Sequence, residues 1–372
     1  MANYEEFKNQ VVDQIKDHLP KELQHCDVFI QQVEKNNQTL DGLIIQDPGN
    51  PITPSIYLNS YFEDHQNGRP MDNILDEISD IRMNAHLDLG KEFEASMLTD
   101  YNQVKDQIVC HLVGSENNQS YLNERPHQMV EDLAVTYHVN LREDSNGTMS
   151  VPVTNQLLAA FGISQEDLHQ QAVTNTEHLY PHKFASMHET MTEIMLPDIM
   201  NSYGMDEASA RAMVEEMMPP DDGNMYVLTN SAKVNGATAL LNEQTMQDIA
   251  EQIGGDYFVL PSSIHEVLVV PKTVDMDYRD LEAMVQEINA NEVAPADRLS
   301  DHVYEYDAKD HELFRSDRAE ERQAEKAAKK EKAKEKTEEK KPSVLGKLKN
   351  AQEKVNSTPV QAGPAHKKEV SL

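Results

Sequence analysis

The sequence predicts an α+β protein, with short mixed or antiparallel sheets covered by helices and followed by a charged C-terminal tail. Three observations support this class. Apolar residues recur at helical spacing over 4–19 and 71–83. Two short apolar runs, at 28–33 and 40–45, lie on either side of a group of turn residues, and this pattern predicts two strands. From residue 316 onward the chain is rich in Lys, Glu and Ala and has no apolar stripe to bury.

The first predicted unit covers residues 1–100. Its opening helix ends at Pro20, because proline cannot continue a helix. The two strand-like runs at 28–33 and 40–45 are joined by a turn that contains Asn36 and Asn37. Asparagine tolerates left-handed backbone, so these runs form a hairpin. A third short strand at 56–58 and the helix over 71–83 complete the unit.

The middle unit, 101–222, has the same predicted order as the first unit: a helix, then a hairpin, then a helix. Apolar residues at 104–112 fit a helix, and 132–141 with 149–153 form a second hairpin around Asn146-Gly147. Ser164 with Asp167 predicts a capped helix that runs to about Asn175. A phrase at 12–19 is similar to one at 105–112, which leaves a diverged duplication of the first unit open.

A methionine-rich segment, residues 187–218, closes the middle unit. Methionine fills irregular cores and also forms adaptable binding surfaces. Core filling in a helical segment is the favoured interpretation, and a partner-binding groove is the alternative.

The third unit, 223–315, is predicted as β-α-β-β-α. Strands at 225–229, 256–260 and 267–270 are short and apolar, so we expect them at the centre of a sheet. A helix over 245–253 stops at Gly254-Gly255, and another covers 278–289. The last segment, 316–372, is expected to be a solvated helix or a disordered tail.

Charge and cysteine content restrict the class of function. The 372 residues carry a formal net charge of −32, and residues 1–315 hold 18 basic against 55 acidic side chains. Because residues 1–315 are this acidic, they repel the phosphates of nucleic acids, and we expect no direct binding to DNA or RNA. Two cysteines exclude a disulfide framework. The N-terminus has no signal-peptide pattern and no run is long enough for a transmembrane segment, so we expect a cytoplasmic protein.

Several phrases carry a resemblance to a known family. They lie at 33–37, 54–59, 132–135, 225–230 and 260–267. Together they resemble an uncharacterised bacterial domain-of-unknown-function family found in anaerobic gut Firmicutes and associated with mobile elements. The resemblance covers most of residues 1–310 and excludes the tail. It implies a bacterial cytoplasmic domain, and no activity can be carried over from it.

The densest polar cluster in an apolar context is Pro261-Ser262-Ser263-Ile264-His265-Glu266. Serine, histidine and glutamate are the residue types of a hydrolytic triad, with Asn230 or an acid from 178–193 as a further partner of His265. Adjacent residues of an extended chain face opposite ways, however, which argues against local convergence. The favoured interpretation is a loop whose hydroxyls and imidazole bind backbone groups.

A second cluster places His182, His188 and Glu193 within one stretch. Histidine and glutamate are zinc ligands, so a metal site is conceivable, but the zincin pattern His-Glu-x-x-His is absent because residue 192 is Thr. Surface or packed histidines are favoured. No phosphate-binding glycine loop is present, and we expect no cofactor.

Three hypotheses about function follow. The leading one is a non-catalytic cytoplasmic binding or regulatory protein with a protein partner, because no catalytic motif converges. The second is an acidic mimic of nucleic acid that inhibits a DNA-binding enzyme. The third is a hydrolase centred on His265. The oligomeric state is left open.

Overall fold

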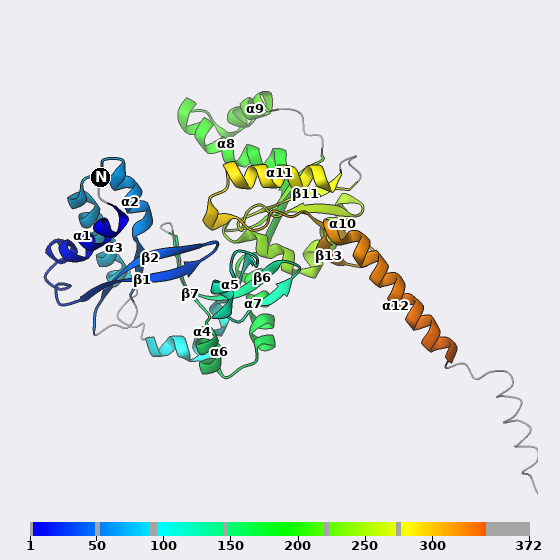
Figure 1. The fold of residues 1–372 in the computed structure, drawn as a ribbon. Helices are drawn as coiled ribbons and strands as arrows, with labels where there is room; N and C mark the ends of the chain where they lie inside the picture. Colours follow the sequence, from blue (N-terminus) through cyan, green and yellow to red (C-terminus); the bar gives the residue numbers. More distant parts are fainter. Residues whose placement is uncertain are drawn as a thin grey trace, which may run out of the picture. The chain divides into compact units, whose positions relative to one another are not determined.

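The computed structural model describes residues 3–48, 53–88, 95–144, 147–218, 223–272 and 277–339. The chain divides into two compact units, Met1–Ser316 and Asp317–Leu372. Helices alternate with short antiparallel sheets in the first unit (Figure 1), which confirms the predicted α+β class. Among the described helices, none has the length and apolar character needed to cross a membrane.

The N-terminal part of the first unit packs three helices against a three-stranded antiparallel sheet. A capping box between Asn3 and Glu6 starts the first helix. The predicted hairpin is present, and Asn37 at its turn has the left-handed φ of 56°. These elements enclose their own apolar core. Their bounds are α1 Tyr4–His18, β1 Asp27–Lys35, β2 Gln38–Gln46, β3 Ser55–Tyr57, α2 Leu58–Gln66 and α3 Met71–Asp88.

A four-stranded antiparallel sheet lies at the centre of the first unit. In it β6 pairs with three strands, β4, β5 and β7. The predicted hairpin is therefore present, although Asn146 of its turn lies outside the described residues. The strands are β4 Ile108–Gly114, β5 Gln128–Val130, β6 Leu133–Asp144 and β7 Gly147–Pro152. Short helical segments precede or interrupt them, namely η1 Ala95–Thr99, α4 Tyr101–Val104, η2 Lys105–Gln107 and α5 Gln119–Asn123.

The helix predicted over 104–112 is wrong. Only Val104 lies at the end of a short helix, and Ile108–Gly114 form β4. The apolar residues of this stretch fit helical spacing, but pairing of all seven residues of β4 with β6 decides in favour of a strand. The phrase shared by 12–19 and 105–112 thus lies in a helix the first time and mostly in a strand the second.

Helices α6 Asn155–Phe161 and α7 Gln165–Leu179 follow the central sheet. The predicted cap is confirmed, because Ser164 and Asp167 form a capping box at the start of α7. Strand β8 His182–Ser186 comes next, and the methionine-rich segment then forms the helices α8 Met187–Tyr203 and α9 Glu207–Met217. Met195, Met200 and Met213 pack partly buried around a small core of α8 and α9, in agreement with core filling.

The third predicted unit contributes to a six-stranded antiparallel sheet in the order β13-β12-β10-β11-β9-β8. The predicted strands and helices are present, and Gly254 ends α10 with a φ of 91°. The strands are β9 Tyr226–Asn230, β10 Tyr257–Leu260, β11 Val267–Pro271, β12 Tyr304–Asp307 and β13 Glu312–Arg315. The helical segments are η3 Gly236–Leu241, α10 Glu243–Ile253, α11 Tyr278–Asn291 and η4 Pro295–Asp297.

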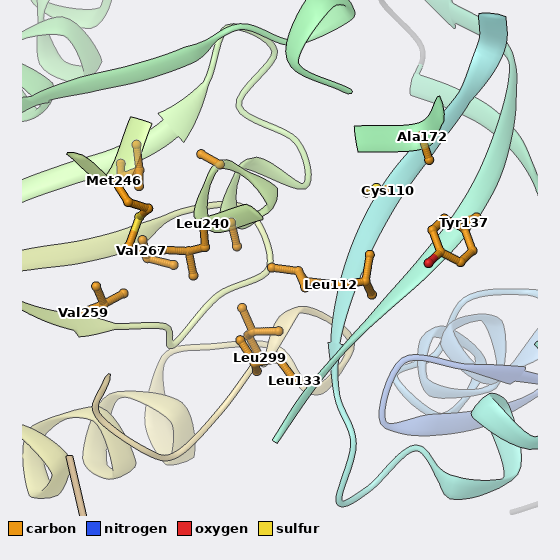
Figure 2. Packing of buried hydrophobic residues seen from close by; sticks show 14 of the residues in the cluster. Cys110, Leu112, Leu133, Tyr137, Ala172, Leu240, Met246, Val259, Val267 and Leu299 are labelled. Carbon is orange, nitrogen blue, oxygen red and sulfur yellow. The ribbon is translucent and has the colours of Figure 1, made fainter. Parts of the chain in front are cut away.

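The main apolar core joins the central sheet to the six-stranded sheet. Figure 2 shows labelled members of this cluster, among them Leu112 and Tyr137 from the central sheet and Val259 and Val267 from the six-stranded one. The predicted core positions of the third unit are buried: Val227, Leu228, Val259, Leu260, Val267 and Val269. The middle and third predicted units therefore share one core within the first compact unit.

The second compact unit begins with the 3-10 turn η5 Ser316–Arg318, which spans the unit boundary, and continues as helix α12 Ala319–Glu339. All apolar clusters of the described residues lie within 1–316. We therefore expect a chain ending at Ser316 to melt within about 2 °C of the full-length protein, since its core is complete. Differential scanning calorimetry measures this. A drop of ten degrees would show that the tail contributes to the core.

Candidate functional site

The central sheet has one face in the main core and a second face that carries polar residues. Cys110 and Leu112 of β4 and Tyr137 of β6 belong to the core. Because side chains alternate along a strand, His111 of β4 and His138 of β6 lie on the opposite face. Both are partly buried. This second face forms the wall of a cavity.

The two histidines stack on each other. Their ring centroids lie 3.9 Å apart and the rings are within 14° of parallel. His111 Nε2 lies 3.3 Å from the Asn235 side-chain amide nitrogen. His138 contacts a hydroxyl group at each nitrogen: Tyr121 at 3.2 Å and Ser150 at 3.3 Å. The pair is therefore held by hydrogen bonds from three segments of the chain, namely α5, β7 and the turn before η3.

Burial keeps both imidazoles neutral. Desolvation lowers the pKa of His111 to about 4, and Lys35 and His265 add to the effect. Desolvation also lowers the pKa of His138 well below its ordinary value, and the neighbouring His111, Lys35 and Arg125 contribute further. At pH 7 the stacked pair therefore carries no charge.

Arg125 supplies a buried positive charge beside the pair. Helix α5 ends before it, and Pro126 disfavours helical backbone at Arg125. The guanidinium carbon lies 3.8 Å from the ring centroid of Tyr121, and Nη1 donates to the Tyr121 carbonyl at 2.6 Å. The residue is 9% exposed, and its buried Nε has no hydrogen-bond partner. Within the described residues, no carboxylate forms an ion pair with it.

Lys35, at the end of β1, provides a second cation. Its ammonium lies 5.3 Å from the ring centroid of Tyr57. Lys35 and Arg125 line the same cavity, which has a volume of about 440 Å³. Glu34 is the one acidic residue among its described lining residues, and its carboxylate accepts a hydrogen bond from Thr39. Polar groups of the lining are Asn36, Thr53, Ser55, Tyr57, His111, Tyr121, His138, Ser150 and Asn235.

The hairpin turn holds one wall of the cavity in place. Asn118 is 2% exposed and its Nδ2 donates to the side-chain oxygens of Asn36 and Asn37 and to the Gly114 carbonyl. Its Oδ1 accepts the Asn37 backbone N–H at 2.8 Å. Asn36 and Asn37 in turn donate to carbonyls of 295–298. This asparagine cluster connects the N-terminal hairpin to the central sheet and to the loop after α11.

The depressed pKa of His111 predicts a pH dependence of stability. Unfolded histidine titrates near pH 6.5 and folded His111 near pH 4, so between these values the unfolded state binds the extra proton. Stability therefore falls as pH falls, by as much as about 2 kcal/mol from pH 7 to pH 5. We expect His111→Gln to lose that much less over this range in urea unfolding. His25→Gln, at an exposed site, is the control. Equal losses in the wild type and His111→Gln would contradict the assignment.

The structure places His265 in a loop that is anchored by backbone hydrogen bonds. Its Nδ1 accepts the Asn235 backbone N–H at 3.2 Å, and its Nε2 lies 3.4 Å from Asp297. The acid beside it is therefore Asp297, and not one from 178–193, which the hydrolase hypothesis offers as an alternative partner. With Nδ1 accepting, Nε2 carries the proton and points to Asp297. Neither ring nitrogen remains to accept a proton from a nucleophile.

The other residues of this cluster do not converge on the His265 ring. Ser263 is buried, and its hydroxyl accepts the His265 backbone N–H. Ser262 pairs through its carbonyl with Leu299 N–H, and Glu266 is exposed. Asn230, a partner that a triad at His265 would require, does not contact the His265 side chain. Its side chain instead donates to the Val234 carbonyl and accepts the Ala232 N–H, because it closes the turn after β9.

His182, His188 and Glu193 are also kept apart. His182 contacts Glu177 and Thr245, His188 contacts Glu215, and Glu193 binds Lys183. In the part of the chain that the structure describes, no group of three or more His, Cys, Asp or Glu side chains is arranged to hold a metal ion. Each member of the predicted metal cluster therefore has its own partner.

A second depression of about 440 Å³ borders Asp132, Arg298 and His302. Its charged side chains have partners of several kinds, and Arg298 Nε donates to the Val293 carbonyl at 3.0 Å. His302 lies 2.7 Å from Glu282, and Asp132 accepts hydrogen bonds from the hydroxyls of Ser300 and Tyr304. The cavity lined by Lys35 and Arg125 differs in its acidic groups, because Glu34 is the one carboxylate among its described lining residues, whereas this depression is lined by Glu116, Asp132 and Asp301.

Sequence reasoning missed Lys35, His111, Tyr121, Arg125 and His138. The alternation of β6 does predict a face with Thr136, His138 and Asn140, opposite the apolar face. An alternating strand usually turns its polar face to water. Only the packing of the hairpin and α5 against this face makes it the wall of a cavity.

The described part of the first unit is an α+β body with a cation-lined cavity on the second face of its central sheet. Residues 4–308 match the model of DUF5688, a family of unknown function, and the chain belongs to this family. The predicted resemblance to a domain-of-unknown-function family is thereby confirmed. No curated protein and no solved structure matches the chain.

Proposed function

We propose that this protein is a non-catalytic binding protein that takes a small anionic ligand into the cavity lined by Lys35, Arg125, His111 and His138. The observation that carries the proposal is Arg125. A guanidinium that is 9% exposed, has an unpartnered Nε and makes no ion pair with a described carboxylate bears an uncompensated charge. Such a charge is costly unless a ligand or partner neutralises it.

The electrostatic setting supports an anion. The chain has a net charge of −32, so its surface repels anions. A site that admits one needs local positive charge, and the cavity combines two cations with a single acidic residue. Guanidinium groups bind phosphate and carboxylate through paired N–H donors, and hydroxyl groups in the lining satisfy further oxygen atoms.

The cavity also favours a ligand of limited size that carries an organic part. Its volume of about 440 Å³ lies within the usual range for small-molecule sites. Val33, Leu112, Met149 and Ile264 supply apolar lining beside the polar groups. An organic phosphate or carboxylate fits this mixture.

Isothermal titration calorimetry with inorganic phosphate, sulfate and citrate tests the proposal. We expect Arg125→Gln to weaken binding by about 2 kcal/mol, or roughly 30-fold, because a charge-assisted hydrogen bond is lost. Arg211→Gln, which makes the same charge change on exposed α9, is the control and should bind as the wild type does. The proposal would be contradicted if the wild type bound none of the three anions, or if Arg125→Gln bound them as tightly as the wild type.

We further propose a bacterial, cytoplasmic and mobile-element-associated setting, which the family resemblance implies. The sequence supports a protein as an additional partner and no direct binding to nucleic acid. An inhibitor that mimics nucleic acid is the second candidate, supported by the excess of carboxylates in residues 1–315. A hydrolase centred on His265 is not proposed, because both ring nitrogens have other partners.

A further inference from the structure

We propose that the cavity binds its anion together with a proton, which is held by His138 on the stacked histidine pair. This inference rests on the proposed anion-binding function. It adds the chemical class of the ligand, which is an oxyanion with a sulfate, phosphate or carboxylate group, and it states that one proton binds to the protein with each anion.

The hydrogen-bond geometry of His138 permits a second proton. Its two ring nitrogens lie against the hydroxyls of Tyr121 and Ser150, at 3.2 Å and 3.3 Å. A hydroxyl oxygen can donate or accept, so both hydroxyls can accept from a protonated imidazole by rotating their hydrogens. The doubly protonated ring therefore keeps both hydrogen bonds.

His111 is not suited to the same role. Its Nε2 lies 3.3 Å from the amide nitrogen of Asn235, which is a donor. A proton on Nε2 would place two donors against each other. The stacked partner of His138 thus stays neutral, and only one proton is held by the pair.

The charges around His138 explain why the proton requires the anion. From β4, the adjacent strand, it faces His111; from β1 it faces Lys35; and from the chain after α5 it faces Arg125. The contacts from α5 and β7 are the uncharged Tyr121 and Ser150. His265, which lies on the loop before β11, acts on the pair through His111. Of these groups, Lys35 and Arg125 carry the positive charges that oppose a proton on His138.

An anion bound at Lys35 and Arg125 reverses this balance. It neutralises the two cations that oppose protonation and places negative charge beside the ring. A unit charge about 4 Å away raises a pKa by up to roughly three units where the effective dielectric constant is near 20. An anion bound beside the ring therefore raises the pKa of His138 and favours uptake of a proton there.

Titration of the full-length protein with sodium sulfate tests this inference. Sulfate keeps its charge between pH 5 and 8, so a proton taken up on binding must go to the protein. Calorimetry in two buffers of different ionisation enthalpy, neither carrying phosphate or carboxylate, measures the protons bound per sulfate. We expect uptake of about three-quarters of a proton or more at pH 6, and a Kd that tightens roughly tenfold or more from pH 7.5 to pH 5.5.

The variant His138→Gln should take up no proton when it binds sulfate, and its Kd should change less than threefold over the same pH range, whatever its affinity at pH 7.5. His188→Gln, on α8 beside Glu215, is the matched control and should behave as the wild type. Sulfate binding without proton uptake in the wild type would overturn this inference and leave the anion-binding proposal intact. Full uptake in His138→Gln would assign the proton to another group. If sulfate, phosphate and citrate all fail to bind, the anion-binding proposal itself fails. The number of protons that the wild type takes up per sulfate tests whether anion and proton bind together, even if the His138→Gln variant does not fold.

Discussion

Gly236→Ala is expected to lower the free energy of unfolding by about 3 kcal/mol or more, because the added methyl group has no room. A Cβ at this position would lie 2.3 Å from the His265 carbonyl oxygen and 2.3 Å from Thr229 Oγ1. It would also lie 2.8 Å from the Asn230 backbone nitrogen. The carbonyl accepts a hydrogen bond from Thr229, so relief of the clash would break that bond.

Urea unfolding followed by circular dichroism measures this loss, and Gly204→Ala is the matched control. Gly204 has a φ of 61° and no atom within 4 Å of an added Cβ, so this change brings only the strain of left-handed backbone, about 1 kcal/mol. Equal losses in the two variants would show that the close approach at Gly236 does not exist.

Asn118→Asp is expected to remove about 3–5 kcal/mol of stability at pH 7.5, although it changes no volume. The amide nitrogen that is replaced donates to three oxygen atoms, at 3.0, 2.9 and 2.7 Å. A carboxylate oxygen in its place would face three acceptors without a proton between them. The side chain is 2% exposed, so water cannot compensate.

The loss should shrink as the pH falls. Burial and the surrounding acceptors raise the folded-state pKa of the new carboxyl, and a protonated carboxyl can donate one of the lost hydrogen bonds. Stability relative to the wild type should therefore be regained from pH 7.5 to pH 5.5. Asn117→Asp, at an adjacent exposed position, has the same charge change and should cost less than about 0.5 kcal/mol. A deficit in Asn118→Asp that does not depend on pH would contradict this explanation.

The asparagine cluster links stability to the proposed function. Asn36 lines the cation-lined cavity, and Asn118 holds Asn36 and Asn37 at the end of the hairpin that also positions Lys35. Loss of this connection should therefore affect anion binding as well as folding. Arg125→Gln should affect binding while leaving the hairpin in place, which separates the two roles.

Local patterns in the sequence were sufficient for much of the secondary structure. Helical spacing and a capping residue predicted α1 and α7, and β-branched runs next to proline or glycine predicted β10 and β11. These features depend on neighbours a few residues away, so a single chain displays them. The prediction of a helix over 104–112 was wrong because the apolar residues there fit the helical period as well as the strand period. The partner strand that decides between them is more than twenty residues away along the chain.

Local patterns in the sequence could not predict the cavity lined by Lys35 and Arg125. Sequence reasoning singled out Ser262, Ser263, His265 and Glu266 but favoured a loop that binds backbone groups, and the structure shows such a loop, with Asp297 beside His265. The residues of the cavity come from β1, β4, β6 and the chain after α5, and no spacing along the sequence marks them as neighbours.

The sequence by itself determined the α+β class, most helices and strands, the separate basic tail and the membership in a family of unknown function. Only the tertiary structure decided that a half-polar strand face is enclosed and that Arg125 is buried without a carboxylate partner. It also decided that two histidines more than twenty-five residues apart stack at 3.9 Å. The physical reason is that burial, and with it the charge state of a side chain, depends on which distant elements pack over it.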